Sequence, residues 1–135
     1  MPDRSLFLVT LLVDDYDAAK SFYCDMLDFV CVEDQPLAKD KRWLVVKPST
    51  SNGAALLLAE ATTSAQKTAL GRQSGDRVCF FLSTDNFERD YRAMVAKGVD
   101  FLEEPRHEAY GTVAVFRDPY GNKWDLIEHS DRSAS

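Results

Sequence analysis

Residues 6–15, Leu-Phe-Leu-Val-Thr-Leu-Leu-Val-Asp-Asp, decide the fold of this 135-residue chain because the same plan returns 70 residues later. The apolar run predicts a buried strand, and the aspartate that ends it, Asp15, is suited to open a helix. Residues 78–85, Val-Cys-Phe-Phe-Leu-Ser-Thr-Asp, follow the same order and end on Asp85. We therefore predict an internal repeat, in which one supersecondary unit occurs twice.

Each copy is predicted to contain a strand, a helix and three further strands. For the first copy, apolar side chains at helical spacing predict a helix over 16–27, and the other expected elements are strands over 6–13, 29–33, 43–47 and 54–60, with a polar turn at 36–41. For the second copy, the expected elements are a strand over 77–83, a helix over 86–97, and strands near 99–103, 112–117 and 123–128.

The length of the chain suits one shared hydrophobic core. With 135 residues and 45% hydrophobic content, two independent cores are not expected. We therefore predict a single domain over 1–135. Its parts are a first module at about 5–60, a connection over 61–75, a second module at about 76–128 and a frayed tail over 129–135.

Charge and composition exclude several classes of partner. A formal net charge of −6 argues against nucleic acid and anionic membranes, which both attract clustered Lys and Arg. No apolar run is long enough to span a membrane, and no secretory signal precedes the first strand, so a cytoplasmic protein is predicted. The three cysteines lack the spacing of a disulfide framework or a zinc site.

Two signatures carry a family resemblance. The first is Val-x-Asp-x-Asp-Ala-Ala followed by Phe-Tyr, within residues 13–23, and the second is Phe-x-Asp-Pro-x-Gly-Asn-x-Trp at residues 116–124. With this order and duplication the chain resembles the vicinal oxygen chelate superfamily, which includes glyoxalase I, extradiol dioxygenases and bleomycin-binding proteins. The resemblance implies an α+β fold of two consecutive βαβββ modules forming a curved mixed sheet around a shared cleft, and a homodimer.

The resemblance also implies where a divalent metal ion would bind. In metal-dependent relatives the ligands lie on the first and last strands of each copy, and here those positions fall on Leu8, on 55–57, on Val78 and on Asp125. Alkyl side chains have no electron pair to donate to a metal ion. Because only Asp125 could donate, we predict no metal ligands and no cofactor.

Asp125 is the most informative candidate site residue. Alternation along a strand sends Trp124 toward a helix and Asp125 into the concave side of the sheet. Burial there would raise the pKa of the carboxyl group, which could then serve as a general acid or base or anchor a cationic ligand. The alternative is a structural acid paired with Arg42, Arg77 or a backbone amide.

The segment 106–111, Arg-His-Glu-Ala-Tyr-Gly, holds the densest group of functional side chains. In relatives the equivalent loop borders the cavity, so it would suit recognition of a small polar or cationic molecule; the alternative is a solvated turn. Aromatic residues on strands line pockets or fill cores. The candidate ligand-binding residues are Trp43, Phe80, Glu108, Tyr110 and Asp125, and of these Glu108 and Asp125 are also the candidate catalytic residues.

Three functions remain open from the sequence. The first is a metal-free site for a small organic molecule, in a binding or sequestering protein or in a cofactor-independent enzyme. The second is a metal-dependent lyase, isomerase or dioxygenase similar to glyoxalase I, with a divalent ion held by Glu108, Asp125 and His107 or a partner-chain residue. The third is a dimeric scaffold without a ligand site. The sequence does not name a ligand or decide whether turnover occurs.

Overall fold

The chain divides into two compact units, residues 1–71 and 72–135, which we call module 1 and module 2. The structure, a computed structural model, describes residues 2–50 and 52–130. The division falls within the predicted connection 61–75. Residues 131–135 of the predicted tail lie outside the described residues, whereas His129 is the last residue of the final strand.

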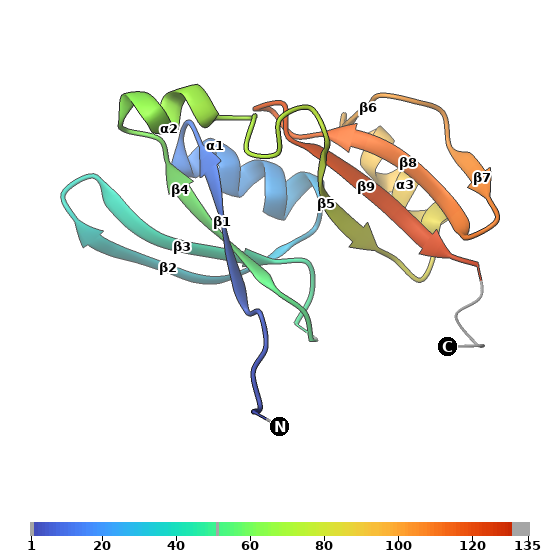
Figure 1. The fold of residues 1–135 in the computed structure, drawn as a ribbon, viewed down its shortest axis with the longest axis horizontal. Helices are drawn as coiled ribbons and strands as arrows, with labels where there is room; N and C mark the ends of the chain where they lie inside the picture. Colours follow the sequence, from blue (N-terminus) through green and yellow to red (C-terminus); the bar gives the residue numbers. More distant parts are fainter. Residues whose placement is uncertain (1, 51, 131–135) are drawn as a thin grey trace. The chain divides into compact units, whose positions relative to one another are not determined.

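Module 1 is a four-stranded mixed sheet with α1 packed against it (Figure 1). The strand order is β1-β4-β3-β2, with β1 and β4 parallel and the other neighbours antiparallel. Its elements are β1 (Leu8–Val13), α1 (Tyr16–Ser21), the π-helix η1 (Phe22–Met26), β2 (Val30–Ala38), β3 (Lys41–Lys47), β4 (Ala55–Glu60) and α2 (Ser64–Ala69).

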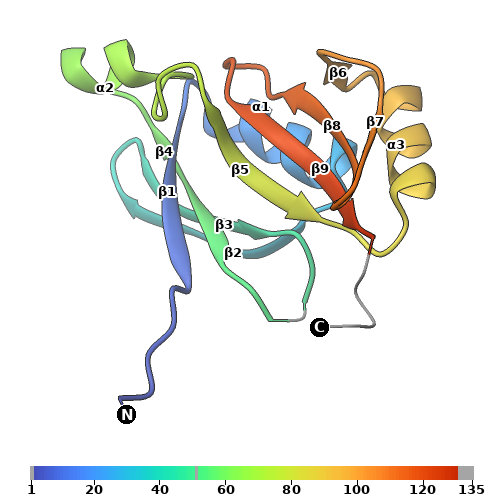
Figure 2. The same ribbon diagram turned by 45° about the vertical axis from the view of Figure 1, so that its right-hand side comes forward.

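Module 2 has a five-stranded mixed sheet with α3 packed against β9 (Figure 2). Its elements are β5 (Val78–Ser83), α3 (Phe87–Ala96), β6 (Asp100–Phe101), β7 (Arg106–Glu108), β8 (Gly111–Arg117) and β9 (Lys123–His129). The main strand order is β5-β9-β8-β6, and β7 pairs with β8. The fold is therefore α+β, as predicted. Every described helix is too short or too polar to cross a bilayer.

The helices that pack against the two sheets, α1 and α3, begin with different caps. Asp15 caps α1 as predicted, because its Oδ1 accepts hydrogen bonds from the backbone N–H groups of Asp17 and Ala18 at 2.9 and 3.3 Å. In α3 the cap is Asn86, whose Oδ1 accepts from the backbone N–H of Arg89 at 3.1 Å. The repeat predicted that Asp85 would open α3, whereas the residue that caps the helix is the next one, Asn86.

The helix predicted over 16–27 changes character halfway. From Phe22 onward it is a π-helix, in which Leu27 N–H donates to the Phe22 carbonyl at 3.2 Å, five residues back. Phe22 and Tyr23 are adjacent in sequence and both buried, with ring centres 5.0 Å apart. The wider turn of the π-helix accompanies the burial of these two consecutive aromatic side chains. The spacing of apolar residues, from which the helix was predicted, does not distinguish a π-helix from an α-helix.

Strand β2 extends through the first half of the segment predicted as a polar turn at 36–41, and β3 begins at its last residue, Lys41. Pro36 lies in the strand opposite Arg42, and only residues 39 and 40 make the turn. The prediction was wrong because β2 is an edge strand, where proline needs no inward hydrogen bond, and its register shifts just after Pro36. Asp40, with φ of 62°, closes the hairpin in the left-handed conformation.

Each sheet has its core on the face that packs against a helix, which is α1 in module 1 and α3 in module 2. In module 1 the fully buried side chains include Leu11 and Val13 of β1, Leu44 of β3 and Leu58 of β4. In module 2 a chain of ring contacts at 4.6 to 5.8 Å links Phe80, Trp124, Phe116, Phe101, Tyr91 and Phe87. The residues that alternate with these along each strand therefore point to the other face of the sheet.

Replacing Gly111 with alanine is expected to destabilise module 2 strongly. Gly111 has φ of 151°, and an added Cβ would lie 2.1 Å from the backbone oxygen of Glu128 on the paired strand. A backbone atom within a sheet ladder cannot move aside cheaply, so we expect a loss of at least about 2 kcal/mol in the free energy of unfolding, measured by urea denaturation.

Gly75→Ala is the matched control for this substitution. Gly75 lies in the same module and also has a positive φ, 71°, but nothing lies within 4 Å of its added Cβ. The loss at Gly75 should therefore be about 1 kcal/mol, from the backbone conformation alone. Equal losses at both positions would contradict the steric explanation.

Candidate functional site

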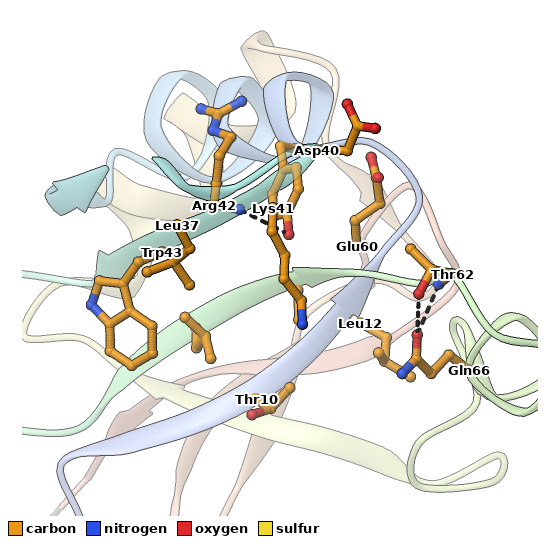
Figure 3. A pocket seen from close by; sticks show the side chains of 13 residues that line it. Thr10, Leu12, Leu37, Asp40, Lys41, Arg42, Trp43, Glu60, Thr62 and Gln66 are labelled. Carbon is orange, nitrogen blue, oxygen red and sulfur yellow. Dashed lines mark hydrogen bonds between the residues drawn. The ribbon is translucent and has the colours of Figure 1, made fainter. Parts of the chain in front are cut away.

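A pocket with a volume of about 410 Å³ lies on module 1 (Figure 3). It combines apolar residues of β1 and β4, an aromatic side chain of β3 and charged residues of the β2–β3 hairpin. The lining residues are Thr10, Leu12, Tyr16, Leu37, Asp40, Lys41, Arg42, Trp43, Leu57, Ala59, Glu60, Thr62 and Gln66. This volume lies within the usual range for pockets that bind small organic molecules.

Strand alternation explains why β3 supplies the aromatic wall of this pocket. Leu44 and Val46 are fully buried on the face that packs against α1. Lys41 and Trp43 therefore point to the opposite face, where both line the pocket. The same alternation in β1 and β4 gives the pocket Thr10, Leu12, Leu57 and Ala59.

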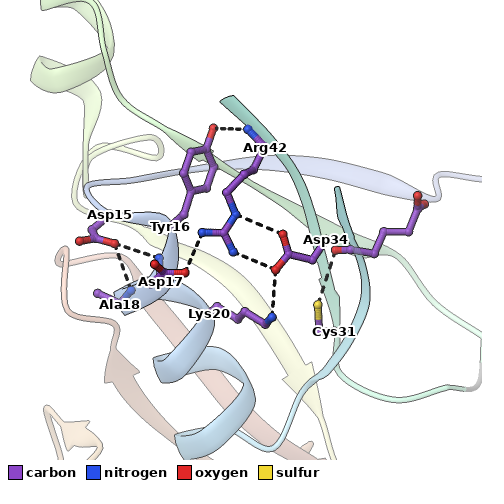
Figure 4. Close-up of polar contacts among 9 residues, drawn as sticks. Asp15, Tyr16, Asp17, Ala18, Lys20, Cys31, Asp34 and Arg42 are labelled. Atoms are coloured by element: carbon purple, nitrogen blue, oxygen red, sulfur yellow. Dashed lines mark hydrogen bonds and ion pairs between the residues drawn. The ribbon is translucent and has the colours of Figure 1, made fainter. Parts of the chain in front are cut away.

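Arg42 also lines the pocket, but its guanidinium group is bound on the α1 side (Figure 4). Its Nε and Nη2 donate to the two carboxylate oxygens of Asp34 at 3.1 and 2.8 Å, and Nη1 donates to Asp17 at 2.7 Å. Lys20 Nζ donates to Asp34 at 2.9 Å, and the Arg42 guanidinium lies 5.2 Å from the centre of the Tyr16 ring. This network ties α1 to the hairpin that carries Trp43.

Asp34→Asn should destabilise the protein at neutral pH and not at very low pH. Hydrogen bonds from Arg42 and Lys20 lower the pKa of Asp34 to about 2. The ionised carboxylate therefore adds stability above about pH 4, the ordinary Asp pKa, and this contribution is lost as pH falls through 2. We expect a loss of about 1 to 2 kcal/mol at pH 7, since the pair is only partly buried, measured by urea denaturation across pH.

The control is Asp25→Asn, which changes an exposed acid on η1 outside the network. Its effect on the free energy of unfolding should be small at every pH. A pH-independent effect of Asp34→Asn would show that shape rather than charge stabilises the hairpin.

Asp125 of module 2 points to the face opposite α3. Its neighbours along β9, Trp124 and Leu126, are 3% and 1% exposed, so they occupy the helix-covered face. On the opposite face Asp125 lies beside Phe81 of β5 and Val115 of β8. The Oδ1 atom of Asp125 is buried and has no hydrogen-bond partner among the described residues. A buried acceptor without a partner is uncommon and marks the position for attention.

Burial raises the pKa of Asp125 above its ordinary value. The positive charge of Arg106 opposes this shift, and the negative charge of Glu103 adds to it. The arginine whose charge acts on Asp125 is thus Arg106, and not Arg42 or Arg77, the two partners suggested by the sequence.

Arg106 is the centre of the polar cluster predicted at 106–111. Its Nη1 donates to Glu108 at 2.8 Å and its Nε donates to Glu103 at 3.0 Å. Hydrogen bonding to Glu103 and to the side chain of Tyr110 raises the pKa of Arg106. Two predicted site residues, Glu108 and Tyr110, therefore bind Arg106, whose positive charge also acts on Asp125. The sequence did contain a signal for the pairing of Arg106 with Glu108. The two residues are two positions apart, which places both side chains on one face of β7.

Two other candidates lie apart from this cluster. The Phe80 ring packs at 4.6 Å from the ring of Trp124, on the helix-covered face. His107 points to the other face of β7, where its Nδ1 lies 3.3 Å from the Thr112 hydroxyl. The register of β5 shifts between Val78 and Phe80, so that Phe81 rather than Phe80 lies beside Asp125.

Comparison with known proteins identifies the family. The Glyoxalase/Bleomycin resistance protein/Dioxygenase superfamily model matches residues 5–126. The chain belongs to this superfamily. An uncharacterized protein from Shewanella frigidimarina is 48% identical over 96% of both chains.

Two solved structures of relatives are similar over almost the whole chain. UcmS2 is 30% identical, with a TM-score of 0.80 over 94% of this chain and 98% of its own. TnmS3, an antibiotic binding protein from Streptomyces sp. CB03234, is 28% identical, with a TM-score of 0.78 over 96% of this chain and 99% of its own.

The donors for a superfamily-type divalent metal ion do not fit. In module 1, Leu8 lies directly beside Ala55 at the positions implied for two ligands. In module 2 the implied position besides Asp125 is Val78 of β5, whose side chain likewise offers no donor, and the strand neighbour of Asp125 is Phe81. Within residues 2–50 and 52–130, no three His, Cys, Asp or Glu side chains form a group able to hold a metal ion.

Asp125→Asn is expected to stabilise the protein at neutral pH. Since the pKa of the acid is raised on folding, its contribution to stability is greatest below the ordinary Asp pKa and is lost as pH rises through the raised value. Removing the charge should raise the thermal unfolding midpoint at pH 7 by a few degrees, and this gain should shrink toward pH 3. Differential scanning calorimetry measures both.

Asp76→Asn, an exposed acid of the same module, serves as control and should change the midpoint little at either pH. Destabilisation by Asp125→Asn at pH 7 would indicate that the ionised carboxylate has a stabilising partner.

Proposed function

We propose that this protein binds a small organic molecule in the pocket of module 1 and does so without a metal ion. The observation that carries the proposal is the pocket itself, about 410 Å³ with apolar strand residues and the Trp43 indole among its lining. Apolar surface supplies most of the affinity in such pockets, and a few polar groups fix orientation. The indole adds a flat surface for an aromatic ligand.

Similarity to an antibiotic binding protein supports a sequestering role. TnmS3 is similar over nearly all of both chains. A protein that sequesters its ligand needs affinity and no reacting groups, which agrees with a pocket lined mainly by strand residues of a single module. We therefore favour binding of an antibiotic-like small molecule over turnover. The homodimer and the cytoplasmic location remain predictions from the family resemblance and the sequence.

The two other functions considered from the sequence have weaker support. A metal-dependent enzyme needs at least three donors, and the implied positions other than Asp125 carry Leu8, the apolar residues at 55–57 and Val78. A scaffold without a ligand site would not need a pocket of this volume. Asp125 and Glu108 remain candidates for a polar contact with a ligand, in a cluster that Arg106 organises.

Trp43 provides the test of this proposal. The protein has two tryptophans, and Trp124 is 3% exposed inside the ring contacts of module 2. A neutral aromatic probe, 2-naphthamide, should quench Trp43 fluorescence in a saturable way. Trp43→Leu should weaken binding of 2-naphthamide by about 5-fold, measured by calorimetry, because a stacked aromatic pair contributes about 1 kcal/mol beyond its buried area.

Val32→Ala is the matched control, since Val32 is 45% exposed on β2 of the same module and does not line the pocket. Its affinity for 2-naphthamide should equal that of the wild type. Dialysis against a chelator should leave binding unchanged, and elemental analysis should find less than about a tenth of an equivalent of transition metal. Stoichiometric metal, or affinity unaffected by Trp43→Leu, would refute the proposal.

A further inference from the structure

The charged side chains around the pocket are unequally engaged. Two of them are basic, Lys41 and Arg42. The guanidinium of Arg42 is already bound by the carboxylates of Asp17 and Asp34. The ammonium group of Lys41 makes no hydrogen bond or ion pair with any residue in the described part of the chain. One cation of the pocket is therefore neutralised by the protein and the other is available to a ligand.

The direction of each side chain follows from the strand. Arg42 lies between Lys41 and Trp43, and adjacent residues of a strand point to opposite faces. Arg42 can therefore reach α1, where Asp17 lies, whereas Lys41 points with Trp43 to the face that carries the pocket. The available cation and the indole are consequently neighbours on one face.

Figure 3 shows how the lysine enters the pocket. Its side chain extends from the hairpin in the direction of Thr10 and Leu12, while the carboxylates of Asp40 and Glu60 lie toward the other side of the view. Lys41 is paired with Ala38 at the closed end of the hairpin, so its backbone position is fixed by the sheet. In this view the ammonium group points away from the carboxylates of Asp40 and Glu60, which also line the pocket.

We propose that the pocket of module 1 selects a ligand with a flat apolar body and an anionic group, held by the ammonium of Lys41. This inference rests on the proposed binding function and names its ligand class, an aromatic carboxylate or an ionised phenol. The ring stacks on Trp43, and the anion lies roughly 7 Å along the strand, the separation of residues two apart.

Because the protein is negatively charged overall, selection of an anionic ligand depends on a positive charge close to the pocket. With a formal net charge of −6, the chain as a whole repels anions. Affinity for an anionic ligand must therefore come from a nearby cation. Lys41 is the residue whose removal isolates that contribution, because removing Arg42 would also break the network that ties α1 to the hairpin.

A matched pair of probes tests the inference. 2-Naphthoate and 2-naphthamide have the same ring system and differ in charge, and 2-naphthylmethylammonium carries the opposite charge. Calorimetry at low ionic strength should show that the wild-type protein binds 2-naphthoate at least about 10-fold more tightly than 2-naphthamide, and binds 2-naphthylmethylammonium most weakly. The preference for 2-naphthoate should decrease as salt is added, because salt screens the ion pair.

Three variants assign the preference to Lys41. Lys41→Gln should reduce the ratio of the two affinities to near one and leave 2-naphthamide binding almost unchanged. Lys41→Arg should restore the ratio, because it keeps the positive charge. Lys39→Gln, at the turn of the same hairpin but outside the pocket lining, should behave like the wild type and control for net charge.

The outcomes separate this inference from the function on which it rests. Equal wild-type affinities for 2-naphthoate and 2-naphthamide, both weakened by Trp43→Leu, would overturn the role of Lys41 and leave the binding site standing. A preference for 2-naphthylmethylammonium would overturn it in favour of the acids Asp40 and Glu60. Affinities that do not respond to Trp43→Leu, or no binding of any probe, would refute both proposals. If Lys39→Gln lost the preference for 2-naphthoate to the same extent as Lys41→Gln, net charge rather than Lys41 would be the cause of the preference.

Discussion

In each module a helix packs against one face of the sheet, and this constraint decides which side chains can meet a ligand. The covered face must be apolar, because backbone and side chains there lose contact with water. In β3 that requirement buries Leu44 and Val46, and strand geometry then directs Lys41 and Trp43 to the opposite face. The pocket of module 1 is thus a consequence of how the core is built.

The two basic residues of the hairpin show how one step along a strand changes the role of a side chain. Arg42 points toward α1 and is bound by Asp17 and Asp34, so that its charge stabilises the fold. Lys41 points into the pocket and has no protein partner among the described residues. A one-residue shift in register would exchange these roles, which is why the left-handed turn at Asp40 matters for the site.

The superfamily fold is retained here with a different set of side chains at the implied metal positions. Leu8 and Ala55 are neighbours on paired strands, and the implied position on β5 is Val78. The remaining carboxyl group, that of Asp125, is therefore left with a buried oxygen, a raised pKa and a neighbouring arginine. A fold specifies where a site can form, whereas the side chains at those positions decide its chemistry.

The sequence by itself determined the α+β class, the order of the strands and helices apart from β7 at Arg106–Glu108, the cap at Asp15 and the placement of Asp125 opposite Trp124, because these depend on local pattern and on strand alternation. It did not reveal the π-helix at Phe22, the extension of β2 through Pro36 or the register shift that brings Phe81 beside Asp125. Nor did it indicate that Arg106 would join Glu108 to Glu103, or that Lys41 would remain without a partner while Arg42 is bound. Only the tertiary structure decided these features, because they depend on the pairing of strands and on contacts between residues far apart in the sequence.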